Sequence, residues 1–486
     1  MKPDKSNKNS KNIKSDNKSF LKKLGIGNNR RTHFGAILIF AIIGAAIVSY
    51  SHAFTILGVF GSDKPLKHPG IQQTKAQLDF VKTKVSSGQQ PWKGEYDKAM
   101  ASRFAKTNYI PSPVAVVSCS SASIAAKTNA NGTPMWPQSG CAEQVNDSQA
   151  AYTQALLWYY SGNEVYAKNA INILNAWAYK LTEIKFDQPR QADGSQVYNN
   201  GHFQAGWAGI NFVKAAEIMR YTYKTPTTGG WSAADIAQQE ASLKQVYYPL
   251  SKDGWSGGQN RQTTLLELNQ AIGVFTNDRV GFLQASLNLQ EEDIKVLIYL
   301  KSDGALPAYP KYKGTQVYKT PDQLASLWTN PTSYANGIEQ ETCRDLGHMM
   351  MGMGSIFNMA ETAKIQGLDL YGKEQTRLTT ALEFNAAFVN AYLDQTANIP
   401  GKTTPVGWAP PNYPCPSFSS TAGGGGNAVA MGWEVGYNHY SNRLKLNLPQ
   451  TTKAVNRIRT MTGTSAAATR VGNQFAWEIL TAAGTP

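Results

Sequence analysis

The sequence has few of the residues from which metal and redox sites are built. Its 486 residues include four cysteines and six histidines, and no two cysteines form a CxxC pair. Cys119, Cys141, Cys343 and Cys415 also lack the spacing of zinc or cluster ligands. The carboxylates do not cluster in the way that binds calcium or magnesium. The sequence therefore predicts a protein that needs no metal and no cofactor.

Charge is scarce and unevenly placed. Only 16% of the residues are charged, and the net charge is +14. Residues 1–31 hold ten Lys/Arg against two Asp, so they contribute +8 and leave +6 for the rest of the chain. A mildly basic domain suits a polyanionic partner. Zinc-finger spacing, a helix-turn-helix signature and a basic stripe are absent outside the tail, so we do not expect nucleic acid as that partner.

One long stretch lacks charge altogether. Residues 34–54 read FGAILIFAIIGAAIVSYSHAF, an apolar run about as long as a bilayer span. The polar, basic residues 1–33 predict a disordered cytoplasmic tail, and everything after the run is predicted to be extracytoplasmic. The length of the run favours a single-pass transmembrane signal anchor in the cell membrane. The alternative is secretion after cleavage at Ala53, because Ser51-His52-Ala53 fits a small-x-small site.

An exported domain can form disulfides. Cys119 and Cys141 flank a loop rich in Ser, Ala, Asn and Gly, and we expect a bond between them that closes this loop. Two interpretations of Cys343 stay open at this point: a bond to Cys415, or a free buried thiol.

Strand patterns are scarce, and helical periodicity recurs along most of the chain. Residues 55–94 predict a linker that leads into a first helix, and residues 95–486 form the predicted main domain. Turn-forming joints separate its helices, which predicts an all-α fold of paired helices wound into an (α/α) toroid, with a plain bundle or solenoid as the alternative. We expect a monomer. The predicted helices span residues 145–160, 163–181, 205–223, 233–247, 262–275, 279–300, 342–366, 373–393, 427–440 and 451–460.

Five segments are polar and aromatic where a core helix would not be: residues 198–203, 255–261, 304–310, 337–354 and 433–440. In the fourth, which reads GIEQETCRDLGHMMMGMG, Arg344 and His348 are four residues apart and would share one helix face. A guanidinium beside an imidazole can bind a carboxylate and move a proton. The alternative is that Arg344 pairs with Glu341 or Asp345 and that His348 is a core histidine.

Seven stretches between residues 146 and 442 carry a resemblance to a known family. They read YTQALLWYYSGNEVYAKNAINILNAWA, AGWAGINFVKAAEIMRYT, QNRQTTLLELNQAIGVFTND, DGALPAY, QETCRDLGHMMMGMG, GLDLYG and YNHYSNR. In this order and spacing they resemble the alginate lyase domain family of polysaccharide lyases. The resemblance implies an (α/α) toroid that cleaves β-1,4-linked polyuronates by β-elimination.

Such a reaction needs groups that neutralise the uronate carboxylate, a base for the C5 proton and an acid for the O4 leaving oxygen. The resemblance implies that Asn260 and Arg344 neutralise the carboxylate. Two positions depart from the best-studied members: Arg261 follows Asn260 where they have His, and Met351 stands where they have a catalytic Tyr. The choice of base therefore stays open.

The candidates for base and acid are Tyr309, in the segment DGALPAY, together with His348 and His202. Arg261 is a candidate for binding the carboxylate of a neighbouring sugar. Trp255 and Tyr312 are candidates for stacking on sugar rings, with core packing as the alternative. The other candidate substrate-binding residues are Asn200, Gln340, His439 and Tyr440.

The sequence thus predicts a lyase that acts on an anionic polysaccharide, either alginate or a glucuronan-like polyuronate. One alternative is a glycoside hydrolase on a similar helical toroid. That reaction needs two opposed carboxylates, and no pair stands out among the candidates Glu267, Glu339, Glu341 and Asp345. The other alternative is a surface protein that binds polysaccharide without cleaving it.

Overall fold

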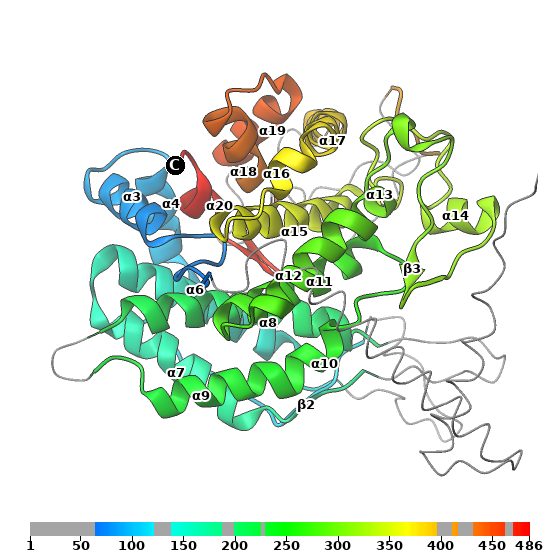
Figure 1. Ribbon diagram of the computed structural model, residues 1–486. Coiled ribbons are helices and arrows are strands. Elements are labelled where there is room, and N and C mark those ends of the chain that lie inside the picture. Colours follow the sequence, from blue (N-terminus) through cyan, green and yellow to red (C-terminus); the bar gives the residue numbers. More distant parts are fainter. Residues whose placement is uncertain are drawn as a thin grey trace, which may run out of the picture. The chain divides into compact units, whose positions relative to one another are not determined.

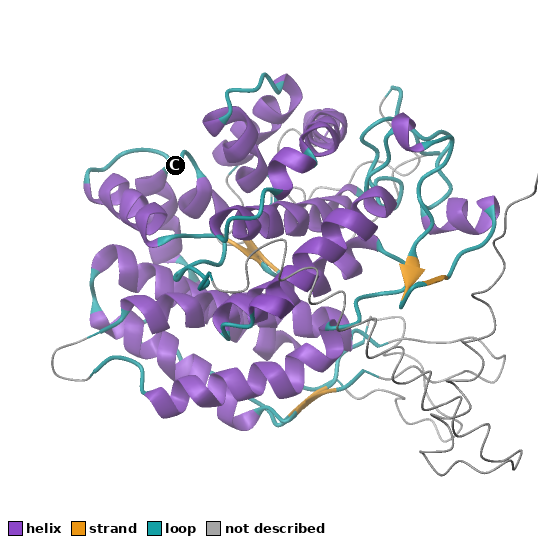
Figure 2. Ribbon diagram, in the orientation of Figure 1, coloured by secondary structure: helices purple, strands orange, loops and turns teal. Residues whose placement is uncertain are grey.

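Helices dominate the structure, as the scarcity of strand patterns predicts (Figures 1 and 2). The computed structural model describes residues 64–120, 138–186, 199–224, 229–395, 411–416, 431–461 and 470–486. The predicted tail and membrane span, residues 1–33 and 34–54, lie outside these ranges. Within them, we find no helix long and apolar enough to cross a membrane. The described residues from Pro65 onward belong to one unit, and this unit includes the predicted first helix.

The α-helices are, in chain order, α3 (Lys75–Ser86), α4 (Trp92–Ala101), α6 (Cys141–Ser161), α7 (Glu164–Lys180), α8 (Gly201–Thr222), α9 (Ala233–Ser242), α10 (Tyr248–Ser251), α11 (Gln259–Phe275), α12 (Arg279–Leu287), α13 (Ile294–Leu297), α14 (Pro321–Leu327), α15 (Leu346–Ile365), α16 (Leu370–Lys373), α17 (Gln375–Gln395), α18 (Glu434–Tyr437), α19 (Pro449–Thr460) and α20 (Glu478–Ala482). Three π-helical turns are η2 (Leu243–Tyr247), η3 (Asn288–Asp293) and η6 (Asn438–Arg443), and two 3₁₀ turns are η1 (Arg103–Ala105) and η4 (Lys301–Asp303).

The strands are two residues long each and form three separate pairs. A parallel pair joins β1 (Val116–Val117) to β2 (Glu183–Ile184). Two antiparallel hairpins are β3 (Lys311–Tyr312) with β4 (Thr315–Gln316), and β5 (Val471–Gly472) with β6 (Phe475–Ala476). Pairs this short do not form a sheet with a core of its own.

Short turns pair the helices. Gly162 ends α6 in the left-handed conformation (φ 74°), which glycine adopts without steric cost. Asn163 then caps α7, because its side chain accepts a hydrogen bond from the backbone N–H of Val165. With a turn this short, α7 must run back along α6.

Four helices, α6, α8, α11 and α15, run side by side in the same direction. At their starts, Gln204 of α8 donates to the backbone carbonyl of Cys141 in α6 (2.9 Å). Gly206 of α8 lies so close to Thr264 of α11 that an added Cβ would be 2.3 Å from its methyl group. Further along, Asn358 of α15 donates to a carboxylate of α11 (2.9 Å). The four helices therefore begin at one common end of the bundle.

The hairpin β5–β6 lies among these four helices (Figures 1 and 2). The backbone carbonyl of Asn473, at its tip, accepts hydrogen bonds from α6 and α8, at 3.1 and 2.9 Å. The side chain of Gln474 is completely buried and donates to α11 and α15, at 3.2 and 3.1 Å. The four helix partners are Gln149, Asn211, Thr264 and Ser355.

Three predicted helices differ from those observed. Of the one predicted over residues 427–440, the first four residues lie outside the described ranges, and the observed helix α18 begins at Glu434 and continues into η6. Residues 279–300 form α12, η3 and α13 and then become extended, because the backbone of Tyr299 pairs with Ile338 (3.0 Å). The helix predicted from residue 342 begins at Leu346, because Asp345 caps it by accepting from the backbone N–H of His348 (2.8 Å). In these last two places a neighbouring group competes with the helix for backbone hydrogen bonds.

Both disulfides are formed. The predicted bond between Cys119 and Cys141 is present, with the Cα atoms 5.6 Å apart. Cys343 is bonded to Cys415, with the Cα atoms 5.2 Å apart, and this settles the alternative that the sequence left open.

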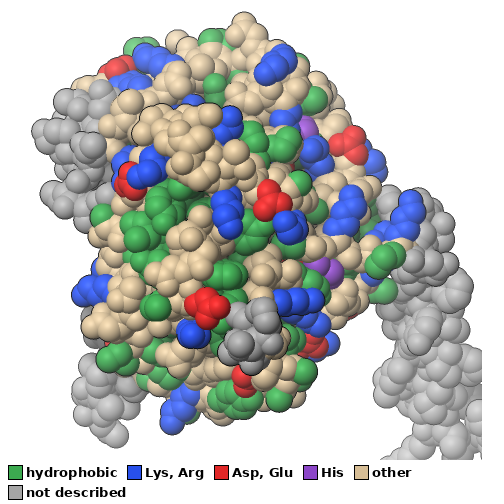
Figure 3. Space-filling model, turned by 90° about the vertical axis from the view of Figure 1, so that its left-hand side faces the viewer, with side chains coloured by type: hydrophobic (Ala, Val, Ile, Leu, Met, Phe, Trp, Pro, Cys, Tyr) green, Lys and Arg blue, Asp and Glu red, His purple; other side chains and the backbone are tan. Residues whose placement is uncertain are grey.

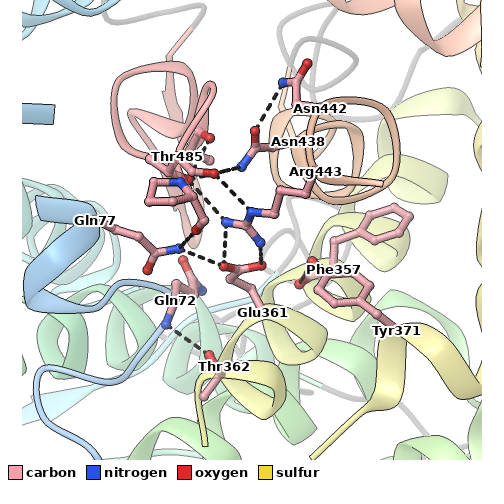
Figure 4. A network of polar contacts seen from close by, with 12 residues as sticks. Gln72, Gln77, Phe357, Glu361, Thr362, Tyr371, Asn438, Asn442, Arg443 and Thr485 are labelled. Carbon is pink, nitrogen blue, oxygen red and sulfur yellow. Dashed lines mark hydrogen bonds and ion pairs between the residues drawn. The ribbon is translucent and has the colours of Figure 1, made fainter. Parts of the chain in front are cut away.

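The far end of α15 ties the two ends of the unit together (Figure 4). Glu361 forms a two-pronged ion pair with Arg443, at 2.7 and 2.9 Å, and accepts from Gln77 of α3 (3.0 Å). Arg443 and Asn438 also donate to Thr485, near the end of the chain. Arg443 and Asn438 belong to η6, whereas Glu361, Gln77 and Thr485 come from three other segments, so the network is a cross-link.

Basic and acidic side chains are mixed on the face of the molecule shown in Figure 3, and the basic ones form no stripe there. Charges scattered in this way favour solubility and form no extended positive surface on this face.

Candidate functional site

The common end of the four helices brings together most of the predicted site residues. Asn260 lies in the first turn of α11 and is buried. Its backbone N–H donates to Glu341 Oε2 (2.7 Å), and its side-chain Nδ2 donates to the sulfur of Met351 (3.5 Å). In the described part of the chain, no donor reaches Asn260 Oδ1, although this atom is buried.

Glu341 also holds the predicted arginine. Arg344 Nη1 lies 2.7 Å from Glu341 Oε1, so one buried carboxylate binds Arg344 with one oxygen and the Asn260 backbone with the other. The Glu341 side chain is inaccessible to solvent, whereas the Arg344 side chain is 44% exposed. Charge-assisted bonds of this length are strong and directional. Glu341 therefore fixes the two predicted carboxylate-neutralising residues next to each other and leaves the guanidinium facing outward.

A second buried carboxyl group supports Glu341. Glu339 Oε2 accepts from the backbone N–H of Glu341 (2.7 Å). Burial, and then the charge of Glu341, raise the pKa of Glu339 well above its ordinary value. A carboxyl group buried beside a second carboxylate ionises less readily, so Glu339 holds its proton more firmly than an exposed glutamate does.

The turn that carries Arg344 is braced from behind. The Cys343–Cys415 disulfide ties it to residues 411–416, and Tyr413 from that segment donates its hydroxyl hydrogen to the backbone carbonyl of Thr342. The hydroxyl of Thr342 donates to Asn385 of α17 (2.9 Å). Arg344 therefore projects from a rigid base, as a binding residue requires.

His348 stands in the first turn of α15 and is oriented by Asp345. Its Nδ1 lies 2.6 Å from Asp345 Oδ2, and its side chain is 20% exposed. Burial opposes ionisation of Asp345, but the hydrogen bond and the charge of His348 outweigh it and lower the Asp345 pKa. With Nδ1–H donated to the carboxylate, Nε2 carries the lone pair. An imidazole held in this way is suited to accept a proton at Nε2.

An aromatic cluster lies at the start of α8. The guanidinium of Arg261 sits over the rings of Trp255 (4.1 Å) and Phe203 (4.4 Å). His202 stacks on Phe186 with ring centroids 3.5 Å apart. Burial, and then the charge of Arg261, lower the pKa of His202 to about 4. His202 is therefore neutral at pH 7 and is a weaker base than an ordinary histidine.

Trp255 also borders a hollow of about 400 Å³, which we call the Trp255 hollow. Tyr312, on the hairpin β3–β4, lies across it. Burial raises the pKa of Asp293, in its wall, to about 6. The lining also holds exposed charges of both signs, and Lys311 and Lys313 pair with Glu292 (3.4 Å) and Asp253 (2.9 Å). A hollow with aromatic and polar walls that adjoins Arg261 is suited to bind further sugar units.

Two predicted substrate-binding residues support the site from within. Gln340 is completely buried; its amide accepts from the backbone N–H of Gln259 (2.5 Å) and donates to the carbonyl of Gly257 (3.1 Å). It thereby fixes the loop before α11. The backbone N–H of Asn200 donates to the carbonyl of Cys119 (2.7 Å), which joins the start of α8 to the first disulfide.

Two predicted residues, His439 and Tyr440, lie apart from this group. His439 stacks on Tyr371 (3.7 Å), and Tyr440 is completely buried and donates to the backbone carbonyl of Tyr371 (3.0 Å). Tyr309 lies near Tyr334, whose phenol pKa is raised by burial and then by Tyr309.

His439 belongs to the far end of α15. Burial is the main cause that lowers the pKa of His439 to about 4, and the charge of Glu361 acts on it in the opposite sense. Glu361 lies thirteen residues after His348 on α15, which corresponds to about 20 Å along the axis. The structure thus places His439 and Tyr440 in the core near the Glu361–Arg443 cross-link and not beside Asn260.

Sequence reasoning did not assign three residues that the structure brings to the site. Glu341 and Asp345 were considered only as hydrolase carboxylates or as partners of Arg344, although the D-x-x-H spacing is that of a helix cap. Asn473 was not singled out at all, because its neighbours in space are far away in the sequence.

Comparisons with known proteins identify the family and the fold. A family model described as alginate lyase matches residues 137–392, more than half of the chain. The fold resembles that of an alginate lyase from Bacteroides ovatus, with 12% identity, coverage of 86% of this chain and 99% of that chain, and a TM-score of 0.50. It also resembles alginate lyase A1-III from Sphingomonas species A1, with 14% identity, coverage of 86% and 97%, and a TM-score of 0.50. At these identities the likeness establishes the fold alone. No curated protein matches the chain.

Proposed function

Because the chain belongs to the alginate lyase family of polysaccharide lyases, we propose that it cleaves a β-1,4-linked polyuronate, either alginate or a glucuronan-like polymer, by β-elimination. One observation carries the assignment of the site: the buried carboxylate of Glu341 holds Asn260 and Arg344 together, at 2.7 Å from each. The amide and the guanidinium would bind the uronate carboxylate and stabilise the enolate-like intermediate that forms when C5 loses its proton.

We assign the base to His348. Its Nδ1 is occupied by Asp345, its side chain is 20% exposed, and it lies four residues after Arg344. Met351 has a thioether, which cannot exchange a proton, so a histidine base fits this chain better than the usual tyrosine. The acid for O4 is either Tyr309 or the imidazolium formed on His348. Replacing Tyr309 by Phe separates these two, since only the first arrangement would lose activity.

Further sugar units would extend over Arg261 and Trp255 towards the Trp255 hollow. Arg261 offers a positive charge to the carboxylate of a neighbouring unit, and Trp255 and Tyr312 offer rings to sugar faces.

We also retain three proposals from the sequence. The helix pairs would close into the (α/α) toroid, and residues 34–54 would anchor a monomeric, extracytoplasmic enzyme in the cell membrane. The two disulfides support export, because such bonds persist in oxidising compartments. Protease added to intact cells should digest the domain; full protection would argue against this topology.

The test of the reaction is the ultraviolet absorbance of the unsaturated uronate produced by elimination. The full chain is supplied separately with polymannuronate, polyguluronate and glucuronan, beside an Asn260→Ala variant. We expect absorbance to rise on one substrate with the wild type and not with the variant. New reducing ends without absorbance would instead establish hydrolysis, and binding without any product would establish a binding protein.

A further inference from the structure

The tip of the β5–β6 hairpin is fixed by many hydrogen bonds for so short a turn. Its two tip residues receive or donate four hydrogen bonds, one with each of the four parallel helices. These bonds use the backbone carbonyl of Asn473 and the side chain of Gln474. They fix the tip of the hairpin. The side chain of Asn473 takes no part in these four hydrogen bonds.

That side chain points to the same atom as the side chain of Asn260. Asn473 Nδ2 lies 4.0 Å from the sulfur of Met351, and Asn260 Nδ2 lies 3.5 Å from it. Two carboxamides, one from α11 and one from the hairpin, therefore converge from different elements on one thioether.

A thioether sulfur is a weak hydrogen-bond acceptor. A carboxylate accepts several hydrogen bonds, and bonds to an ionised acceptor are shorter and stronger than those to a neutral one. Two amide donors that share one sulfur would therefore gain by turning to a carboxylate, one donor to each oxygen. Little is lost when they leave the sulfur.

We propose that Asn473 is a second carboxylate-binding amide of the active site, paired with Asn260 around Met351, and that its ligand is the carboxylate of the uronate unit that loses its C5 proton. This inference rests on the proposed function. It also adds to the site a residue that lies outside residues 137–392, the part matched by the family model.

The backbone at Asn473 makes a clean test available. Asn473 has φ 51°, in the left-handed region that asparagine and glycine tolerate best. Asn473→Gly thus removes the carboxamide and keeps both the turn and the carbonyl that binds α6 and α8. Asn330 provides the matched control, because it is exposed and also has φ 51°.

We expect N473G to lower kcat/KM on the polyuronate by about 10- to 100-fold, the range for a lost hydrogen bond to a charged group. N330G should leave kcat/KM unchanged. The loss in N473G should shrink on a substrate whose carboxylates are methyl-esterified, since a neutral ester is a poorer acceptor; a purely structural role would lower both activities equally.

An N473G variant that cleaves the polyuronate as fast as the wild type overturns the inference, as does an equal loss on free and esterified substrates. If N473G melts well below the wild type, N473D replaces it, because Asp has nearly the same shape and its charge repels a carboxylate. N473D should then lose activity with the fold intact, and wild-type activity of N473D also overturns the inference. If the wild type itself cleaves no polyuronate, the proposed function fails instead.

Discussion

The two ends of helix α15 each hold a buried glutamate paired with an arginine, and the two pairs differ in exposure. At the first end, Arg344 is 44% exposed on a carboxylate that is inaccessible to solvent. At the far end, Arg443 is 13% exposed on Glu361. The same two residue types therefore present a cation to solvent at one end and enclose it at the other.

The surroundings explain this difference. Arg443 binds both oxygens of Glu361 and the backbone carbonyl of Thr485, so its planar fork is used within the protein. Glu341 divides its oxygens between Arg344 and the Asn260 backbone. A nearly buried guanidinium that binds several acceptors of the protein acts as a cross-link, whereas one that is held by a buried carboxylate and is partly exposed can also bind a ligand.

The histidines near the two ends of α15, His348 and His439, also differ in exposure and in hydrogen bonding. His348 is partly exposed and its Nδ1 is occupied by Asp345. His439 is buried and stacked on Tyr371, and no partner among the described residues reaches its Nδ1. A proton-transfer group needs access to the substrate as well as an orienting partner, and only His348 has both.

The largest expected effect is on stability, at the far end. Arg443→Met would leave the Glu361 carboxylate buried without its cation, which costs about 3–5 kcal/mol of unfolding free energy. Thermal unfolding followed by circular dichroism measures this. Lys168→Ala, which breaks an exposed pair with Glu164, is the control and should cost about 0.5 kcal/mol or less. Equal effects of the two variants would contradict the cross-link.

The next effect is on activity, at the first end. Arg344→Met should lower kcat by about 10²–10³-fold, as the loss of one stabilising donor does in other enzymes. Arg344 is 44% exposed, so water can take its place beside the Glu341 carboxylate once the guanidinium is removed. We therefore expect a much smaller fall in melting temperature than for Arg443→Met. The initial rate at which absorbance rises tests the expected fall in kcat, and a melting curve tests the expected change in stability. If Arg344→Met lost stability but kept its rate, Arg344 would be a structural cross-link and not a substrate-binding residue.

A smaller effect concerns pH. The folded-state pKa of Glu339 is raised, so above pH ~4.5 the unfolded chain loses this proton while the native state keeps it. Stability should therefore fall as pH rises towards the folded pKa, by up to about 1.4 kcal/mol per pH unit. Glu339→Gln carries no such proton. Denaturant unfolding from pH 5 to 8 should show the wild type losing stability relative to the variant; parallel curves would refute the raised pKa.

The smallest effect is expected at His439. His439→Phe keeps an aromatic ring against Tyr371 and removes no group from the site around Asn260, so kcat/KM should change by less than about 2-fold, within the range of a substitution that leaves the transition-state contacts in place. The lyase assay at a temperature well below the melting point tests this. A large loss of rate without loss of stability would return His439 to the list of substrate-binding residues.

Much of the fold could be predicted because helical periodicity is local. The helices predicted over residues 163–181 and 262–275 appear as α7 and α11 with ends shifted by a few residues. The break after Leu297 could not be predicted, because it depends on pairing with residues 338–340. Arg344 does not share the helix face of His348, since the cap at Asp345 moves the helix start past it.

Of the candidate site, the sequence could predict only the residues that the family resemblance implies. That resemblance supplied Asn260 and Arg344, and the structure explains their proximity through Glu341. It gave no reason to choose the base among Tyr309, His348 and His202, because the contact of His348 with Asp345 and the burial of His202 appear only in the fold. Asn473 could not be found from sequence, since Gln149, the partner of its carbonyl, lies 324 positions earlier.

The hairpin β5–β6 also bears on how the protein comes to be active as it is synthesised. The contacts of its tip connect segments separated by between 119 and 324 positions, and contacts of such long range form slowly. A nascent chain that has not yet emerged past Asn473 lacks both the tip that joins the four helices and the proposed second amide. Its helices can assemble in pairs as they appear, but the site cannot be completed until this segment arrives. Degradation of polymer would therefore begin only after the domain has been finished.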